Sequence, residues 1–132
     1  MTLPHYTRAQ QLPEILENRI AILDGAMGTM VQRLKLTEAQ FRGERFQDFH
    51  KDVKGNNELL VLTQPQFITD IHEGYLAAGA DLIETDTFGA TTVAQADYDM
   101  QELAREMNVA AARLARAACD KFSTADKPRF VV

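Results

Sequence analysis

Three short apolar runs divide this chain, and a stretch with helical periodicity separates the second run from each of the others. The runs lie at 20–23, 81–85 and 129–132, and the longest helical stretches lie at 65–78 and 103–120. A nearly continuous apolar run bounded by turn residues is typical of a strand covered on both faces, which occurs mostly in parallel sheets. The order strand, helix, strand, helix, strand therefore predicts parallel βα units within an α/β fold.

Shorter helices are expected near Pro13 and at 27–34 and 37–41, and the turn signal Gly55-Asn-Asn57 lies in an irregular region from 34 to 62. Apolar residues three and four positions apart predict which helix faces are buried. Those residues are Leu12, Ile15, Leu16, Ile68, Ile71, Tyr75, Ala78, Leu103, Met107, Ala110, Leu114 and Ala117. Gly79 follows the helix of 65–78 at the position where a left-handed residue ends a helix.

Composition excludes several classes of protein. The chain has 132 residues, a net charge of −5 and a pI near 5.1, which disfavours a nucleic-acid partner. A single cysteine, Cys119, excludes an internal disulfide and a zinc site built from several thiolates. The apolar runs are too short to span a bilayer, and the start of the sequence lacks the pattern of a signal peptide. We therefore expect one cytoplasmic domain that binds neither membrane nor nucleic acid.

Two loops follow the first two expected strands, where parallel α/β folds bind their ligands. In the first, Asp24–Gly28 leads into a helix, and its glycines and free N–H groups suit an anion such as a carboxylate. An ordinary tight turn explains the same spacing. The second is Glu84-Thr-Asp-Thr-Phe-Gly89, whose polar side chains are costly to bury unless they face a site or each other. The alternative is a capped turn with Asp86 or Thr87 as the N-cap.

Other residues carry weaker signals. No two histidines have a spacing typical of metal ligands, and His72 is expected on the surface of its helix. Cys119 is expected to be a small, partly buried side chain on the flank of the last helix. The two loops are expected to lie side by side if the first two strands are neighbours, and this favours a binding site.

Several motifs in combination resemble the N-terminal region of cobalamin-dependent methionine synthases. They are Ile22-Leu-Asp-Gly-Ala-Met-Gly-Thr-Met30, Phe41-Arg-Gly-Glu-Arg-Phe46, Lys54-Gly-Asn-Asn57, Ala78-Gly-Ala-Asp-Leu-Ile-Glu-Thr-Asp-Thr-Phe88 and Ala94-Gln-Ala-Asp-Tyr98. The resemblance extends from about Leu16 to the last residue. The long insert that carries the second and third motifs separates this family from simpler homocysteine methyltransferases.

The resemblance implies that residues 1–132 are the first βαβαβ portion of a homocysteine-binding (β/α)8 TIM barrel, incomplete in this chain. In this family, zinc-bound homocysteine takes a methyl group from methylcobalamin, giving methionine, and methyltetrahydrofolate recharges the cobalamin. The domains for folate, cobalamin and S-adenosylmethionine-dependent activation, and the three zinc-binding cysteines, are absent from these residues. The resemblance therefore assigns no metal ligand and no catalytic residue here.

The same resemblance assigns seven residues to the amino-acid end of the homocysteine pocket. They are Asp24, Gly25, Ala26 and Met27 in the first loop and Thr85, Asp86 and Thr87 in the second. The family pattern in the second loop is Glu-Thr-Asn-Thr-Phe-Asn, so Asp86 replaces an amide donor with a group that can carry negative charge. Such a change strengthens substrate binding if residue 86 lies near the ammonium group of the substrate, and weakens it if the residue lies near the substrate carboxylate.

A closed barrel of this type needs about 250 residues. We therefore expect that the 132-residue chain alone neither binds zinc or cobalamin nor turns over homocysteine. We also expect its unpaired strand edges and apolar faces to favour self-association or a rearranged fold. Two alternatives remain: a non-catalytic module that binds a small amino acid, and a nucleotide-binding doubly wound domain, although the sequence lacks a phosphate-binding motif.

Overall fold

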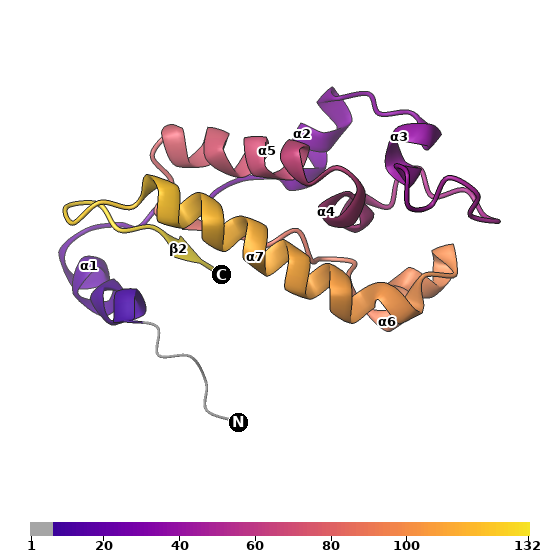
Figure 1. The fold of residues 1–132 in the computed structure, drawn as a ribbon. Coiled ribbons are helices and arrows are strands. Elements are labelled where there is room, and N and C mark those ends of the chain that lie inside the picture. Colours follow the sequence, from indigo (N-terminus) through magenta and orange to yellow (C-terminus); the bar gives the residue numbers. More distant parts are fainter. Residues whose placement is uncertain (1–6) are drawn as a thin grey trace.

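The computed structural model describes residues 7–132, which form a helix-rich α/β fold with a small parallel sheet (Figure 1). The α-helices are α1 (Leu12–Asn18), α2 (Met27–Arg33), α3 (Glu38–Arg42), α4 (Leu60–Thr63), α5 (Pro65–Ala77), α6 (Thr92–Gln95) and α7 (Ala104–Phe122). The strands are β1 (Leu82–Ile83) and β2 (Phe130–Val131), and 3-10 helices η1 to η4 span Thr7–Gln11, Asn57–Leu59, Ala96–Tyr98 and Gln101–Leu103. None of these helices combines the length and apolar composition needed to cross a membrane.

Three parallel backbone segments lie side by side, in the order that the sequence predicts. Strands β1 and β2 pair in parallel, with Leu82 opposite Phe130, and Leu23 forms a single parallel bridge to Leu82 on the other side. The N–H of Asp81 donates to the carbonyl of Ile22 at 2.8 Å, and the N–H of Asp24 donates to that of Leu82 at 2.9 Å. The predicted parallel order is thus confirmed, although each strand has only two paired residues.

The expectation that 20–23 is a strand covered on both faces is wrong. Ile20 is 83% exposed, and Ile22 and Leu23 are about half exposed. Polar contacts hold this segment instead. The buried carboxylate of Asp81 accepts two hydrogen bonds of 2.9 Å from the Arg19 guanidinium and one of 2.9 Å from the N–H of Ile22. The bonds from Arg19 hold the pKa of Asp81 below its usual range.

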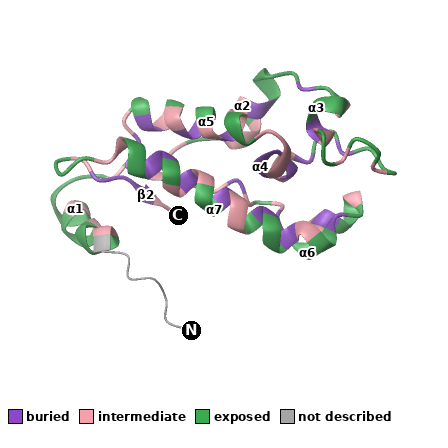
Figure 2. Cartoon of the chain, in the orientation of Figure 1, coloured by how far each residue is buried: buried purple, intermediate pink, exposed green. Residues whose placement is uncertain are grey.

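Helices α5 and α7 pack against each other along much of their length, and their facing sides are the buried ones (Figures 1 and 2). The buried stripe of α7 consists mainly of alanines: Ala104, Ala111, Ala115 and Ala118, together with Met107 and Cys119. Small side chains let two helices approach closely. The predicted stripe is therefore partly wrong, because Met107 is central whereas Leu103, Ala110 and Leu114 are only half-buried and Ala117 is exposed.

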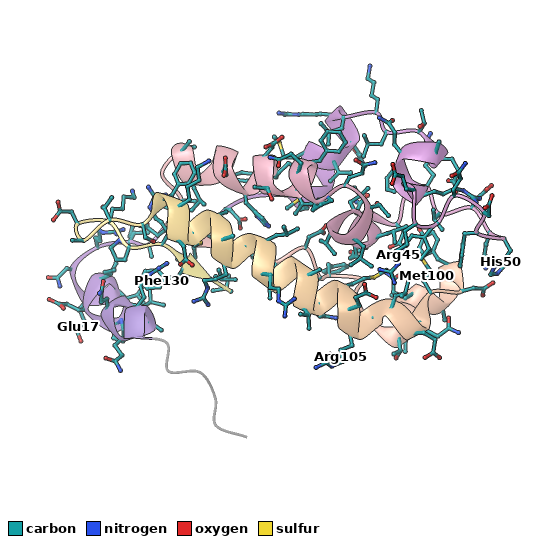
Figure 3. All side chains as sticks on the ribbon, viewed as in Figure 1. Glu17, Arg45, His50, Met100, Arg105 and Phe130 are labelled. Carbon is teal, nitrogen blue, oxygen red and sulfur yellow. The ribbon has the colours of Figure 1, made fainter. Side chains whose placement is uncertain are left out.

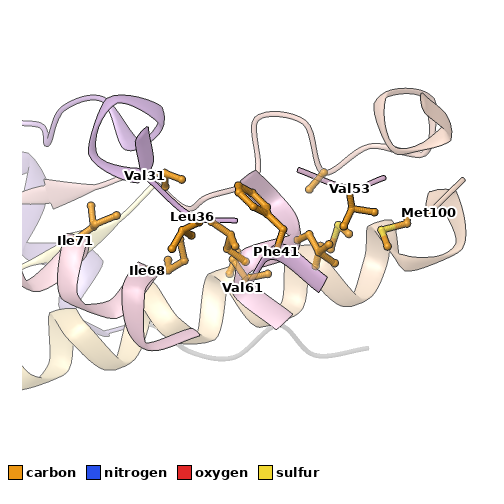
Figure 4. Close-up of a cluster of buried hydrophobic side chains, with 13 residues drawn as sticks. Val31, Leu36, Phe41, Val53, Val61, Ile68, Ile71 and Met100 are labelled. Atoms are coloured by element: carbon orange, nitrogen blue, oxygen red, sulfur yellow. The ribbon is translucent and has the colours of Figure 1, made fainter. Parts of the chain in front are cut away.

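Two apolar clusters form the core, and both include residues of α5 and α7. The first cluster, shown in Figure 4, gathers residues from α2 to α7 around Leu59, Leu60 and Ile68. The second contains Leu76, Ala80, Ile83, Ala115, Ala118 and Cys119, and lies where α5 and α7 meet the sheet. By contrast, α1 begins near Pro13 as predicted but buries none of its residues, since Leu16 is 57% exposed.

The predicted helices near 27–34 and 37–41 are confirmed as α2 and α3, and the loop after α3 is ordered by side chains of that helix. The Glu38 carboxylate accepts from the N–H groups of Val53 and Lys54 and from Arg42. Arg42 also donates to the carbonyl of Phe49. The Arg45–Glu106 ion pair and the His50–Asp99 hydrogen bond, both exposed, join this loop to the start of α7 and the turn before it. Arg45 and His50 are labelled in Figure 3.

His72 is buried, so the expectation that it lies on the helix surface is wrong. It lies four residues from both Ile68 and Leu76, on the face of α5 that meets α7. Neither ring nitrogen has a hydrogen-bond partner among the described residues. Burial lowers the pKa of His72 to about 4, because the apolar surroundings disfavour the imidazolium ion.

We predict that His72 makes the fold acid-sensitive. Its pKa is lower in the folded chain than its usual value of about 6.5, so the unfolded chain binds the proton first. The contribution of neutral His72 to the unfolding free energy is present above pH 6.5 and is lost as the pH falls toward 4. From pH 7 to pH 5, the unfolding free energy of the unchanged chain should fall by about 2 kcal/mol more than that of His72→Leu.

Urea unfolding at a series of pH values measures this difference. Gln101→Leu provides the control, because Gln101 is exposed and does not titrate, so its replacement should leave the pH dependence unchanged. A constant difference between His72→Leu and the unchanged chain across this pH range would contradict the prediction.

Candidate functional site

The two loops predicted to form a site do lie side by side. The N–H of Glu84, directly after β1, donates to the Asp24 carboxylate at 3.1 Å. The carboxylate that ends the first segment therefore also caps the end of the neighbouring strand. Burial, together with repulsion from the nearby Glu84 carboxylate, raises the pKa of Asp24 to about 6 despite the hydrogen bond from the Glu84 N–H.

The first loop is a short turn from Asp24 to the start of α2 at Met27. A side chain at Gly25 would clash with Tyr75, since its Cβ would lie 3.0 Å from the tyrosine hydroxyl oxygen. That hydroxyl donates to the carbonyl of Ala26 at 3.3 Å. Helical spacing predicts Tyr75 on the buried face of α5, but it is only half-buried, and its hydroxyl contacts this loop.

In the second loop, the two threonines bond to each other and the aspartate between them is buried. The hydroxyls of Thr85 and Thr87 are 2.8 Å apart, and the N–H of Thr85 donates to the carbonyl of Val132. Asp86 is 5% exposed, and its Oδ2 has no partner among the described residues. The alternative in which Asp86 or Thr87 caps a helix is wrong, because Thr91 is the N-cap of α6.

Burial also sets the charge state of Asp86. It raises the pKa of this carboxyl to about 7, and repulsion from the nearby Glu58 carboxylate contributes to the increase. Asp86 and Asp24 therefore both titrate near neutral pH, one on each loop. Perturbed carboxyls of this kind are common at functional sites, although structural networks also produce them.

A buried polar network, which sequence reasoning missed, fixes the far end of the second loop. The side-chain amides of Asn56 and Gln95 bond to each other reciprocally, at 2.8 and 3.0 Å. Gln95 also donates to the carbonyl of Gly89 at 3.0 Å, and Glu58 accepts from the N–H of Gly89 at 2.8 Å. Both backbone polar groups of Gly89 are thus held by side chains. The signal in the sequence was the Gly55-Asn-Asn57 motif, which we interpreted only as a turn.

The described residues do not fit a metal centre. Residues 7–132 contain no group of three histidine, cysteine or carboxylate side chains arranged to hold a metal ion. Cys119 is fully buried, whereas partial burial was expected, and its thiol lies 3.5 Å from the carbonyl of Phe130. Burial raises the pKa of this thiol to about 11, which disfavours the thiolate that a metal requires.

We predict that the Asn56–Gln95 pair stabilises the fold as a unit. Gln95→Leu leaves the Asn56 amide and the Gly89 carbonyl without their partner, and should cost about 2–3 kcal/mol of unfolding free energy. Asn56→Leu/Gln95→Leu should cost less than the sum of the two single changes, because no lone amide is then buried.

Chemical denaturation of the three variants measures this coupling. Gln101→Leu, at an exposed position, is the matched control and should change stability by less than about 0.5 kcal/mol. If the loss of unfolding free energy in the double variant equals the sum of the losses in the two single variants, the two amides act independently.

Comparisons with known proteins agree with this geometry. The homocysteine S-methyltransferase family model matches residues 21–132. The fold is similar to that of the homocysteine methyltransferase MmuM from Escherichia coli in its oxidized form, with a TM-score of 0.69 and 21% sequence identity. The similarity covers 92% of this chain but only 39% of that one, so the chain spans well under half the length of this methyltransferase. The family match includes both loops and both strands, and the chain belongs to the homocysteine S-methyltransferase family.

Proposed function

We propose that this chain is the first part of a homocysteine-methylating enzyme, and that its two loops hold the amino-acid end of homocysteine. The observation that carries the proposal is the hydrogen bond between Asp24 and the N–H of Glu84, which brings the two loops together at one end of the sheet. Family membership supports the choice of substrate over a nucleotide.

The proposed domain is the start of a (β/α)8 barrel. The three parallel segments, with α5 before β1 and α7 between β1 and β2, follow the order of the first units of such a barrel. The exposed apolar side chains of Ile22, Leu23, Phe88 and Val132 on or beside these segments support it as well. In a complete barrel, further strands would cover such side chains.

Each loop has a distinct proposed role. The Asp24 carboxylate faces the second loop and attracts the ammonium group of the substrate. The backbone N–H groups of 25–27 donate hydrogen bonds to the carboxylate of the substrate. Asp86 adds a second acidic group, and the Thr85–Thr87 hydroxyl pair borders it. Tyr75 and Gly25 fix the backbone of the first loop so that it cannot move away from the second.

The motif combination supports a more specific enzyme, a cobalamin-dependent methionine synthase. In such an enzyme, zinc keeps the homocysteine thiol deprotonated and cobalamin, recharged by methyltetrahydrofolate, carries the methyl group. Cys119 is unsuited to hold the zinc, as its burial shows. The part of these residues in the reaction is therefore to bind and orient the amino acid, and we propose that the chain alone is inactive.

We predict that the chain binds L-homocysteine weakly and that Asp24→Asn reduces the affinity about tenfold, because a charge-assisted hydrogen bond to the ammonium group is lost. Amide shifts of 24–27 and 84–87 in NMR titrations without zinc measure this binding. Asp97→Asn, at an exposed position, is the control. Equal affinities for Asp24→Asn and Asp97→Asn would refute the role of Asp24. Measurable binding in the absence of zinc is also what the non-catalytic amino-acid-binding module predicts, and neither hypothesis expects turnover by the chain alone. A methyltransferase assay of a longer protein that contains this chain therefore distinguishes the two.

We predict that homocysteine binding strengthens as the pH rises from 6 to 8. Below pH 7 Asp86 is largely protonated, and above it the carboxylate adds negative charge where the ammonium group binds. Asp86→Asn should flatten the profile between pH 7 and 8, where Asp24 is already largely ionised, whereas Asp24→Asn should keep the rise in that range. An affinity that falls with rising pH would instead place Asp86 beside the substrate carboxylate.

A further inference from the structure

A pocket lies outside the candidate site, between α2 and the Lys54–Asn57 turn. Its volume is about 420 Å³, within the range of roughly 300–1,000 Å³ typical of small-molecule sites. Val31, Leu36 and Phe41 line it, and Figure 4 shows these three side chains together in the first core cluster. They are only 3–5% exposed, so the apolar floor of the pocket is the outer edge of the core.

The rim of this pocket is cationic, although the chain as a whole is acidic. Lys35 and Lys54 both line it, and neither forms an ion pair with another described residue. Two other lysines, Lys51 and Lys121, are each paired with a carboxylate. The carboxylate closest to Lys54 in the hydrogen-bond network, that of Glu38, accepts from its backbone N–H and from Arg42. Two exposed ammonium groups thus lie at one pocket without a carboxylate partner among residues 7–132.

Lys35 also occupies an unfavourable backbone position. It follows α2 with a φ of 50°, in the left-handed region that glycine usually occupies after a helix. A side chain there adds strain that glycine would not have, and such strain is concentrated at functional sites. Two amides complete the rim: the side chains of Gln32 and Asn57 form no hydrogen bond with other residues in the described part of the chain.

We propose that this pocket binds a small organic carboxylate with an apolar body. The apolar part would contact Val31, Leu36 and Phe41, and the carboxylate would accept hydrogen bonds from Lys35, Lys54 and the amides of Gln32 and Asn57. An inorganic anion would leave the floor unfilled, and a neutral ligand would leave both ammonium groups unpaired. The proposal is independent of homocysteine binding, since no residue of the two loops lines this pocket.

NMR titration of the 132-residue chain with phenylacetate, phenylacetamide and inorganic phosphate tests this proposal. Phenylacetate should give saturable shifts of the Val31 and Leu36 methyl groups, and the two other probes should bind several times more weakly. Lys35→Gly and Lys54→Gln should each weaken phenylacetate binding about two- to fivefold. Lys121→Gln, on α7 and outside the pocket, should leave it unchanged.

Lys35→Gly separates a binding role from a structural one. Glycine relieves the left-handed strain, so the variant should melt at a higher temperature while it binds phenylacetate less tightly. Equal binding of phenylacetate and phenylacetamide, or unchanged binding by both lysine variants, would overturn the ionic part of the proposal. Phosphate binding as tight as that of phenylacetate would overturn the role of the apolar floor, and an absence of saturable shifts would overturn the site itself.

Discussion

The close packing of α5 against α7 is the interaction on which the rest of this structure depends. Helix α5 leads into β1 and α7 leads into β2, so the distance between the helices determines how the strands meet. The alanines of α7 let the helices approach, and the strands then pair with Leu82 opposite Phe130. Because each strand pairs at only two residues, side-chain packing rather than the ladder of backbone hydrogen bonds carries most of the stability.

The parallel arrangement has a chemical consequence, because it places the ends of neighbouring segments at one edge. Asp24 and Asp86 come after adjacent segments, and both carboxyls are partly or fully withdrawn from water. Desolvation disfavours their charged forms, so the chain retains two groups there that oppose its own stability when they ionise. The ammonium group of the proposed ligand would offset this cost with its positive charge.

Sequence reasoning predicted the elements that depend on local signals and missed those that depend on tertiary contacts. The start of α5 at Pro65, the left-handed Gly79 and the parallel order follow from residue type and spacing. The exposure of Ile20 and the burial of His72 do not, because an apolar run or a lone polar residue on a helix has the same local pattern in either environment. The contact between Asn56 and Gln95 joins residues 39 positions apart, and the Gly55-Asn-Asn57 motif indicates the turn but not its partner.

The turn at 55–57 connects the two regions to which we assign binding. Asn56 points into the buried network that holds Gly89 at the end of the second loop, whereas Asn57 lines the cationic pocket. Asn57 also lies beside Gly28, since its side-chain nitrogen is 3.7 Å from the position that a Cβ would occupy there. Adjacent residues of one turn thus lie next to both regions: Asn56 is linked to the second loop through Gln95, and Asn57 lies beside the helix that follows the first loop.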